Sequence, residues 1–258
     1  MSKRILAHLT RTDPILGGVI RAAGPLKLAI RDHEPFQALA HAIAHQQLNG
    51  IAANTILGRL IATCGQSAFP TPQAILDAST ETLRAAGFSF AKVAALKDLA
   101  AKTLAAVVPD RATLATLEDA VIIERLTQVR GVGRWTVEML LMFQLGRPDV
   151  LPVDDFGVRA GFRAAYGLTR LPKPKVLALW GERWKPYRSA AAWYLWRALE
   201  LERAGKLPAP AERVVLPRLP RKRRKVATRK AQRKKRASRP AKTAARARRK
   251  RAGTRRTG

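Results

Sequence analysis

Apolar residues recur every three or four positions along most of this chain, as far as about residue 205. This spacing is typical of amphipathic helices, whereas the β-branched runs that favour strands are short. Glycine, proline and capping residues separate the periodic segments and indicate where helices begin and end. The pattern therefore predicts an all-α fold. The predicted helical segments are residues 36–63, 72–78, 80–86, 91–107, 118–129, 134–145, 156–166, 174–182 and 189–204.

A glycine turn joins two of these segments into a helix–hairpin–helix unit over residues 126–145. Its two glycines permit a sharp turn and a close approach to another molecule. The first N–H groups of the second helix have no partner inside that helix and attract anions, and the flanking arginines add positive charge. A glycine turn is also typical of an ordinary helical corner. The candidate phosphate-binding residues are Arg130, Gly131, Val132, Gly133 and Arg134.

A pair of aspartates follows the hairpin. Asp154 and Asp155 come directly after the extended segment 151–153 and precede the predicted helix 156–166. Aspartate is a preferred N-cap, but one aspartate suffices to cap a helix. We expect the extended return to bring both carboxylates back towards the glycine turn. Because a phosphate-bearing ligand repels carboxylates, one that lies beside a phosphate-binding turn is expected to take part in chemistry.

The distribution of charge divides the chain into a helical region, residues 1–210, and a basic tail, residues 211–258. Residues 213–258 hold 22 Lys or Arg and no Asp or Glu, so most of the formal net charge of +31 belongs to the tail. No apolar periodicity continues beyond about Leu219. Such a segment cannot bury enough apolar surface to fold, so we predict that it is disordered and binds polyanions such as DNA or RNA.

The hairpin and the aspartates carry a resemblance to a known family. The run Leu-x-x-Val-x-Gly-Val-Gly-Arg-Trp-Thr from Leu126, followed by Leu-Pro-Val-Asp-Asp, resembles the helix-hairpin-helix DNA glycosylase superfamily. Within it, the chain is similar to the short, all-helical form of the DNA-3-methyladenine glycosylase II branch, over roughly residues 5 to 205. The resemblance implies a two-lobed helical fold, and an enzyme that flips alkylated bases out of duplex DNA and removes them by hydrolysis, which leaves an abasic site.

The resemblance also implies roles for individual residues. Asp155, 24 residues after Gly131, matches the family's catalytic aspartate. Asp154 remains a rival, because the return could be displaced by one residue, and it would otherwise be the cap or an orienting neighbour. Trp135 and Trp196 match the pocket of this branch, where an aromatic face attracts positively charged alkylated purines. Packing in the core is the alternative for both tryptophans.

A base that leaves the duplex must be replaced by a wedge from the protein. Gln47 and Leu48 follow an apolar helix at a turn, in a stretch that resembles the part of the family's fold that inserts into DNA, and either is a candidate for the wedge. The alternative for Leu48 is a place in the core.

Lysine chemistry and bound cofactors are not expected. Lyase-active members of the family have a lysine directly after the Gly-x-Gly-Arg motif, where this chain has Trp135, so no Schiff base is implied. The single cysteine, Cys64, excludes a four-cysteine iron–sulfur cluster. The four histidines lack a metal-ligand pattern. A monovalent cation at the hairpin is the one ion that this interpretation leaves open.

The expected partner is double-stranded DNA that contains alkylated bases, and the expected state is a monomer. The sequence has no apolar run of membrane-spanning length and no signal-peptide pattern, so we expect the nucleoid of a bacterial cytoplasm or a eukaryotic nucleus. Two alternatives remain, a non-catalytic DNA-binding or nucleoid protein and a glycosylase for oxidised or mismatched bases. The sequence does not rank 3-methyladenine, 7-methylguanine, hypoxanthine and etheno adducts as substrates.

Overall fold

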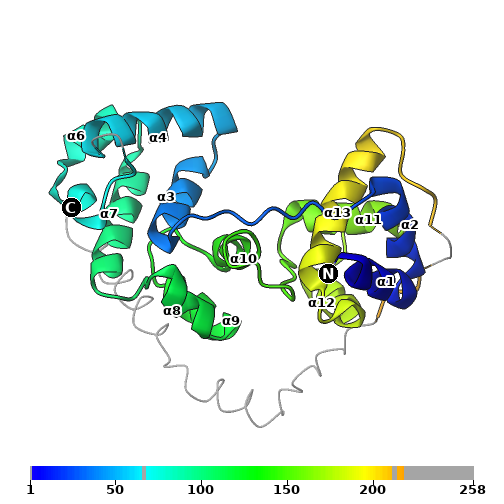
Figure 1. Ribbon diagram of the computed structural model, residues 1–258. Coiled ribbons are helices and arrows are strands. Elements are labelled where there is room, and N and C mark those ends of the chain that lie inside the picture. Colours follow the sequence, from blue (N-terminus) through cyan, green and yellow to red (C-terminus); the bar gives the residue numbers. More distant parts are fainter. Residues whose placement is uncertain (1, 66–67, 211–213, 218–258) are drawn as a thin grey trace, which may run out of the picture. The chain divides into compact units, whose positions relative to one another are not determined.

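The computed structural model describes residues 2–65, 68–210 and 214–217. Within them the chain forms α-helices and one short 3-10 helix without any strand, as the apolar periodicity predicts (Figure 1). Apart from 214–217, the predicted basic tail lies outside the described residues. The helices are α1 (Ser2–Thr12), α2 (Pro14–Ala23), α3 (Pro35–His45), α4 (Gly50–Cys64), α5 (Pro72–Asp77), α6 (Thr80–Ala85), α7 (Phe90–Leu104), α8 (Arg111–Thr116), α9 (Asp119–Leu126), α10 (Arg134–Phe143), α11 (Phe156–Ala165), α12 (Pro174–Gly181), η1 (Glu182–Trp184) and α13 (Arg188–Arg203).

The observed helices differ from the predicted segments in two ways. The segment 36–63 is two helices, α3 and α4, because Gln47 adopts a left-handed φ of 58° and the Asn49 side chain caps α4. Three helices, α1, α2 and α8, were not among the predicted segments. Asp13 and Asp110 cap α2 and α8, so a local start signal was present for both, whereas α1 begins with polar and basic residues.

The helices pack in two groups, in agreement with the two-lobed fold that the resemblance implies. In the first group α3 packs against α4, α7 and α10, and α7 also contacts α5 and α6. In the second group α13 packs against α2 and α11, and α1 contacts α2 and η1. The buried residues of the two groups belong to one continuous apolar core.

The second group depends on a close approach of α11 to α13. A Cβ atom on Gly161 of α11 would overlap the Leu195 backbone of α13, so only glycine permits this spacing. Trp180 and Trp184 are buried in this group. None of the described helices is long and apolar enough to cross a membrane.

Candidate active site

Asp155 is the N-cap of α11. Its backbone is extended, with φ −64° and ψ 127°, and its Oδ1 accepts a hydrogen bond of 2.7 Å from the Val158 N–H. The carboxylate therefore lies at the positive end of the helix dipole, where negative charge is stabilised. A residue fixed in this way at a helix end has little freedom to move, which suits a group that must keep its position during a reaction.

Both tryptophans that the resemblance assigns to the base pocket contact Asp155. The indole N–H of Trp135 donates to Oδ2 at 2.8 Å, and the indole N–H of Trp196 donates to Oδ1 at 2.9 Å. With Val158, three donors hold a carboxylate that can accept about four hydrogen bonds, so acceptor capacity remains on Oδ2. Trp135 is 47% exposed, whereas Trp196 is partly buried and stacks on Phe143 with ring centroids 5.9 Å apart.

Asp154 has a different environment from its neighbour. Its side chain is exposed, and within the described residues it makes no hydrogen bond to α11. Of the two roles that the sequence leaves for Asp154, the helix cap is wrong, because the return delivers Asp155 to the N-cap position, and the role of an orienting neighbour stays a prediction. Asp155 thus combines the capping and the candidate catalytic roles that the sequence interpretation divided between two residues.

Gly157 allows Trp196 to reach the carboxylate. A Cβ atom at this position would lie 2.7 Å from the Cδ1 atom of the Trp196 indole and 3.2 Å from Oδ1 of Asp155. Real Cβ atoms do not approach other heavy atoms to 2.7 Å, so a larger residue would force the indole away. Sequence reasoning missed this glycine, because its importance depends on a side chain from α13.

The two glycines of the hairpin between α9 and α10 have different backbone conformations. Gly131 has a φ of 77°, which favours glycine, but Gly133 has an extended φ of −96°, so only one of the two needs a left-handed backbone. A Cβ atom on Gly133 would meet nothing within 4 Å. The N–H groups of Gly131, Gly133 and Arg134 donate to no acceptor in the part of the chain that the structure describes. Gly133 therefore leaves open space beside free donors, which suits the close approach of a phosphate.

Hydrogen bonds fix the first half of the hairpin to α7. Oδ2 of Asp98 accepts from the Arg130 N–H at 2.7 Å, and Lys102 donates to the Gln128 carbonyl at 2.6 Å. Burial raises the pKa of Asp98, but the hydrogen bonds from Arg130 and Lys102 outweigh it and leave this pKa below its usual value. Val132 is 5% exposed and its N–H donates to Val129, so its side chain packs the turn inwards.

Arg134, at the first position of α10, is paired with a buried acid. Its Nε lies 2.8 Å from Oε1 of Glu138, while most of the Arg134 side chain remains exposed. Burial raises the pKa of Glu138, and the charge of Arg134 opposes this shift. Arg134 is therefore oriented by Glu138 and still faces solvent beside the hairpin.

The turn between α3 and α4 lies against the hairpin. The Gln46 side-chain amide donates to the Gly131 carbonyl at 2.8 Å. Gln47 is exposed in its left-handed conformation, and Leu48 is 40% exposed, so Leu48 is not a core residue. Both wedge candidates are thus presented to solvent next to the glycine hairpin. Sequence reasoning missed Gln46, because its partner lies 85 positions further along the chain.

A pocket of about 410 Å³ lies between the α3–α4 turn and α10. Its size is within the range of small-molecule sites, and its lining is mostly apolar with a few polar groups. Trp135 lines this pocket, but Trp196 does not. The residues around it are Ala42, His45, Gln46, Gln47, Trp135, Thr136 and Met139.

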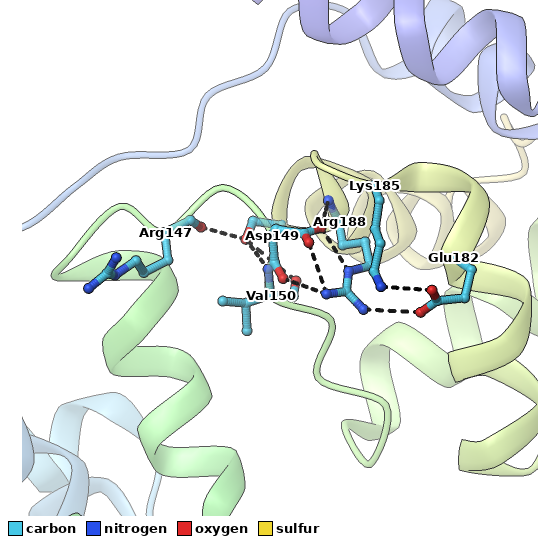
Figure 2. A network of polar contacts seen from close by, with 7 residues as sticks. Arg147, Asp149, Val150, Glu182, Lys185 and Arg188 are labelled. Carbon is cyan, nitrogen blue, oxygen red and sulfur yellow. Dashed lines mark hydrogen bonds and ion pairs between the residues drawn. The ribbon is translucent and has the colours of Figure 1, made fainter. Parts of the chain in front are cut away.

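A polar network positions the return that carries Asp155 (Figure 2). Nε and Nη2 of Arg188 lie 2.7 and 2.9 Å from the two carboxylate oxygens of Asp149. Arg188 also reaches Glu182, which pairs with Lys185 at 2.7 Å. The Ser189 hydroxyl accepts from the Val150 N–H and donates to the Arg147 carbonyl. The return is therefore held to the start of α13, the helix that supplies Trp196.

The glycine hairpin and the capping Asp155 both lie inside the part of the chain that matches a known family. The HhH-GPD superfamily base excision DNA repair protein family matches residues 40–186, and the chain belongs to this superfamily. The chain is 39% identical over 196 residues to DNA-3-methyladenine glycosylase 1 of Schizosaccharomyces pombe, covering 75% of this chain and 86% of the relative.

Two solved structures extend the comparison. The first is the S. pombe 3-methyladenine DNA glycosylase in complex with abasic DNA, with a TM-score of 0.68 and 38% identity over 75% of this chain and 95% of that one. The second is a DNA-3-methyladenine glycosidase from Bacillus halodurans, with a TM-score of 0.71 and 34% identity over 78% of this chain and 91% of that one. The helical fold and the family expected from the sequence are thereby confirmed.

Proposed function

We propose that this protein is a DNA glycosylase that hydrolyses the bond between an alkylated base and its deoxyribose, with Asp155 as the carboxylate that acts on the reacting sugar. The observation that carries the proposal is the environment of Asp155. Three donors orient its carboxylate next to Trp135, which lines a pocket of about 410 Å³. The names of the relatives, which specify 3-methyladenine, support alkylated purines as the substrate class.

The target base must first leave the duplex, at a cost of a few kcal/mol of unstacking. The free N–H groups of the hairpin turn bind a backbone phosphate, and Arg130 and Arg134 add charge beside it. Gln47 or Leu48 fills the gap in the stack. The flipped base then enters the pocket between this turn and Trp135.

The leaving base makes the sugar resemble an oxocarbenium ion, which a fixed carboxylate stabilises. Asp155 needs no reorganisation to do this, because its hydrogen bonds hold it in place before substrate arrives. Its remaining acceptor capacity on Oδ2 orients the attacking water. An alkylated purine that carries positive charge is already a good leaving group and is attracted to the exposed indole of Trp135. The reaction therefore needs no general acid.

The reaction stops at the abasic site. Trp135 occupies the position where lyase-active relatives of this fold have a lysine, so no amine is placed to form a Schiff base with the sugar. Borohydride treatment during the reaction should trap no covalent complex of protein and DNA. A robust trapped complex would contradict the monofunctional mechanism.

Incubation of the protein with N-methylated duplex DNA, followed by chromatography of the released bases, tests the proposal. We expect free methylated purines and intact strands with abasic sites. A non-catalytic DNA-binding protein would bind the same DNA and release nothing. Release of oxidised bases alone, from DNA that carries oxidative damage, would instead favour a different glycosylase specificity.

A further inference from the structure

The pocket beside Trp135 contains a side chain to which the reaction assigns no role, His45. This residue ends α3, and it lines both the pocket of about 410 Å³ and an adjoining pocket of about 290 Å³. Its Nδ1 lies 2.9 Å from the carbonyl oxygen of His41. A carbonyl oxygen only accepts hydrogen bonds, so Nδ1 must carry the hydrogen. In the neutral imidazole, Nε2 is then an acceptor, and no donor in the described part of the chain occupies it.

Two further histidines hold the His45 ring in place. His41 stacks on His45 with ring centroids 6.4 Å apart, and His33 stacks on His41 at 5.4 Å. Burial, followed by the charges of His33, His45 and Arg31, lowers the pKa of His41 to about 4. His41 is therefore uncharged at neutral pH. The Nδ1 hydrogen bond and the stacked rings orient the exposed His45 ring, and with it the direction of Nε2.

Gln46, Gln47 and Thr136 also line this pocket, and each carries a donor as well as an acceptor. The Gln46 amide nitrogen is committed to Gly131, and Gln47 belongs to the exposed turn. The Thr136 hydroxyl can both donate and accept, so it suits either kind of base edge. In the neutral form of His45, whose Nδ1 carries the hydrogen, Nε2 can only accept.

We propose that His45 determines which alkylated purine is released fastest, by accepting a hydrogen bond at Nε2 from the 6-amino group of an adenine adduct. Guanine adducts carry a 6-oxo group, which is itself an acceptor and would face the lone pair of Nε2. Purines that enter the pocket through the same glycosidic nitrogen bring their 6-substituents to the same place. His45 therefore favours 3-methyladenine over 7-methylguanine. This inference rests on the proposed function, because it requires that the flipped base enters this pocket.

Methylated duplex DNA offers both bases in one reaction, so their release can be compared directly. The full chain, in excess over DNA, is mixed with this substrate, and the two bases are quantified over time. His45→Leu keeps the volume and removes the acceptor. We expect it to lower the rate constant for 3-methyladenine by about tenfold and to leave that for 7-methylguanine nearly unchanged, because a lost hydrogen bond of this kind is worth on the order of one factor of ten. His8→Leu is the matched control, since His8 belongs to α1 and lines neither pocket, and its ratio of rates should match wild type.

A second substitution tests the role of His45 in case His45→Leu does not fold. In His45→Gln the side-chain amide can present either its oxygen or its nitrogen to the base. The ratio of the two release rate constants should therefore shift towards 7-methylguanine, and this variant can be measured even if His45→Leu does not fold. An unchanged ratio in either folded variant, or an equal fall for both bases, would overturn the role of His45. If the wild-type protein releases neither base, the proposed function itself fails, and that result is distinct from a change in ratio.

Discussion

Asp13 and Asp155 each cap the first turn of a helix, and each accepts hydrogen bonds from two tryptophan indoles. Asp13 is 1% exposed, and its Oδ2 accepts from a tyrosine hydroxyl at 2.6 Å and from both indoles at 3.0 Å. Asp155 is only partly buried and divides its donors between two oxygens. The donors of Asp13 are Leu16, Tyr166, Trp180 and Trp184.

An aspartate that caps a helix and accepts hydrogen bonds from two indoles thus has a structural role at Asp13 and a candidate catalytic role at Asp155. At Asp13, burial and four hydrogen bonds tie the carboxylate to the surrounding helices, so its role is structural. Burial and the nearby charge of Asp13 raise the pKa of Tyr166, so this hydroxyl remains a donor. At Asp155, three hydrogen bonds orient the carboxylate but leave acceptor capacity on a side that solvent reaches. Position, rather than residue type, therefore distinguishes a structural aspartate from a candidate catalytic one.

The largest expected effect is the loss of chemistry in Asp155→Asn. Asparagine is also a good N-cap, so the fold should remain, but the negative charge beside the sugar is gone. We expect single-turnover base release to fall on the order of 10²–10³-fold, with binding to duplex DNA retained. Asp154→Asn is the matched control and should stay active, because Asp154 is exposed and does not cap α11. An inactive Asp154→Asn together with an active Asp155→Asn would reverse the assignment.

The corresponding change at the buried aspartate should affect stability instead. Asp13→Asn replaces an acceptor by an amide that cannot satisfy all three donors on Oδ2. We expect the free energy of unfolding in urea to fall by about 3 kcal/mol, while base release per folded molecule is unchanged. A variant that keeps wild-type stability but loses base release would show that the two aspartates do not differ as described.

A smaller effect should follow from crowding the contact between Asp155 and Trp196. In Gly157→Ala the new Cβ displaces the Trp196 indole, and we expect base release to fall about tenfold, the effect of one lost hydrogen bond to a charged group. Gly58→Ala is the matched control, because Gly58 lies inside α4 with nothing within 4 Å of a new Cβ. Both substitutions raise helix propensity, by up to roughly 1 kcal/mol. Equal activity of the two variants would mean that Trp196 does not position the carboxylate.

Removal of the basic tail should leave both aspartate sites unchanged. Truncation after Glu212 removes 22 Lys or Arg, and if about a third of them contact phosphates, the slope of log K against log salt should flatten by roughly 6. Single-turnover release at saturating protein should hardly change. An unchanged salt slope would exclude the tail from DNA binding, and a loss of release at saturation would assign it a role in the active site.

Short-range signals predicted more of this molecule than long-range ones. The hairpin and the return to Asp155 lie within 30 residues, and glycine, proline and aspartate mark their turns locally. The role of Trp196 came only from the family resemblance, since its contact with Asp155 spans 41 positions. The contact of Asp13 with Tyr166 spans 153 positions, and no periodic pattern in the sequence predicts it. Such contacts depend on how helices pack, which apolar spacing alone does not specify.

The hydrogen bond between Trp135 and Asp155 links the hairpin to the candidate catalytic carboxylate. Trp135 belongs to the first turn of α10, whose free N–H groups are candidates to bind a phosphate, while Asp155 and Trp196 belong to segments that Arg188 and Ser189 hold together. A shift of the hairpin on DNA would thus change one hydrogen bond of the carboxylate and spare the other two. The indole of Trp135 therefore couples the position of the hairpin to the orientation of the candidate catalytic carboxylate.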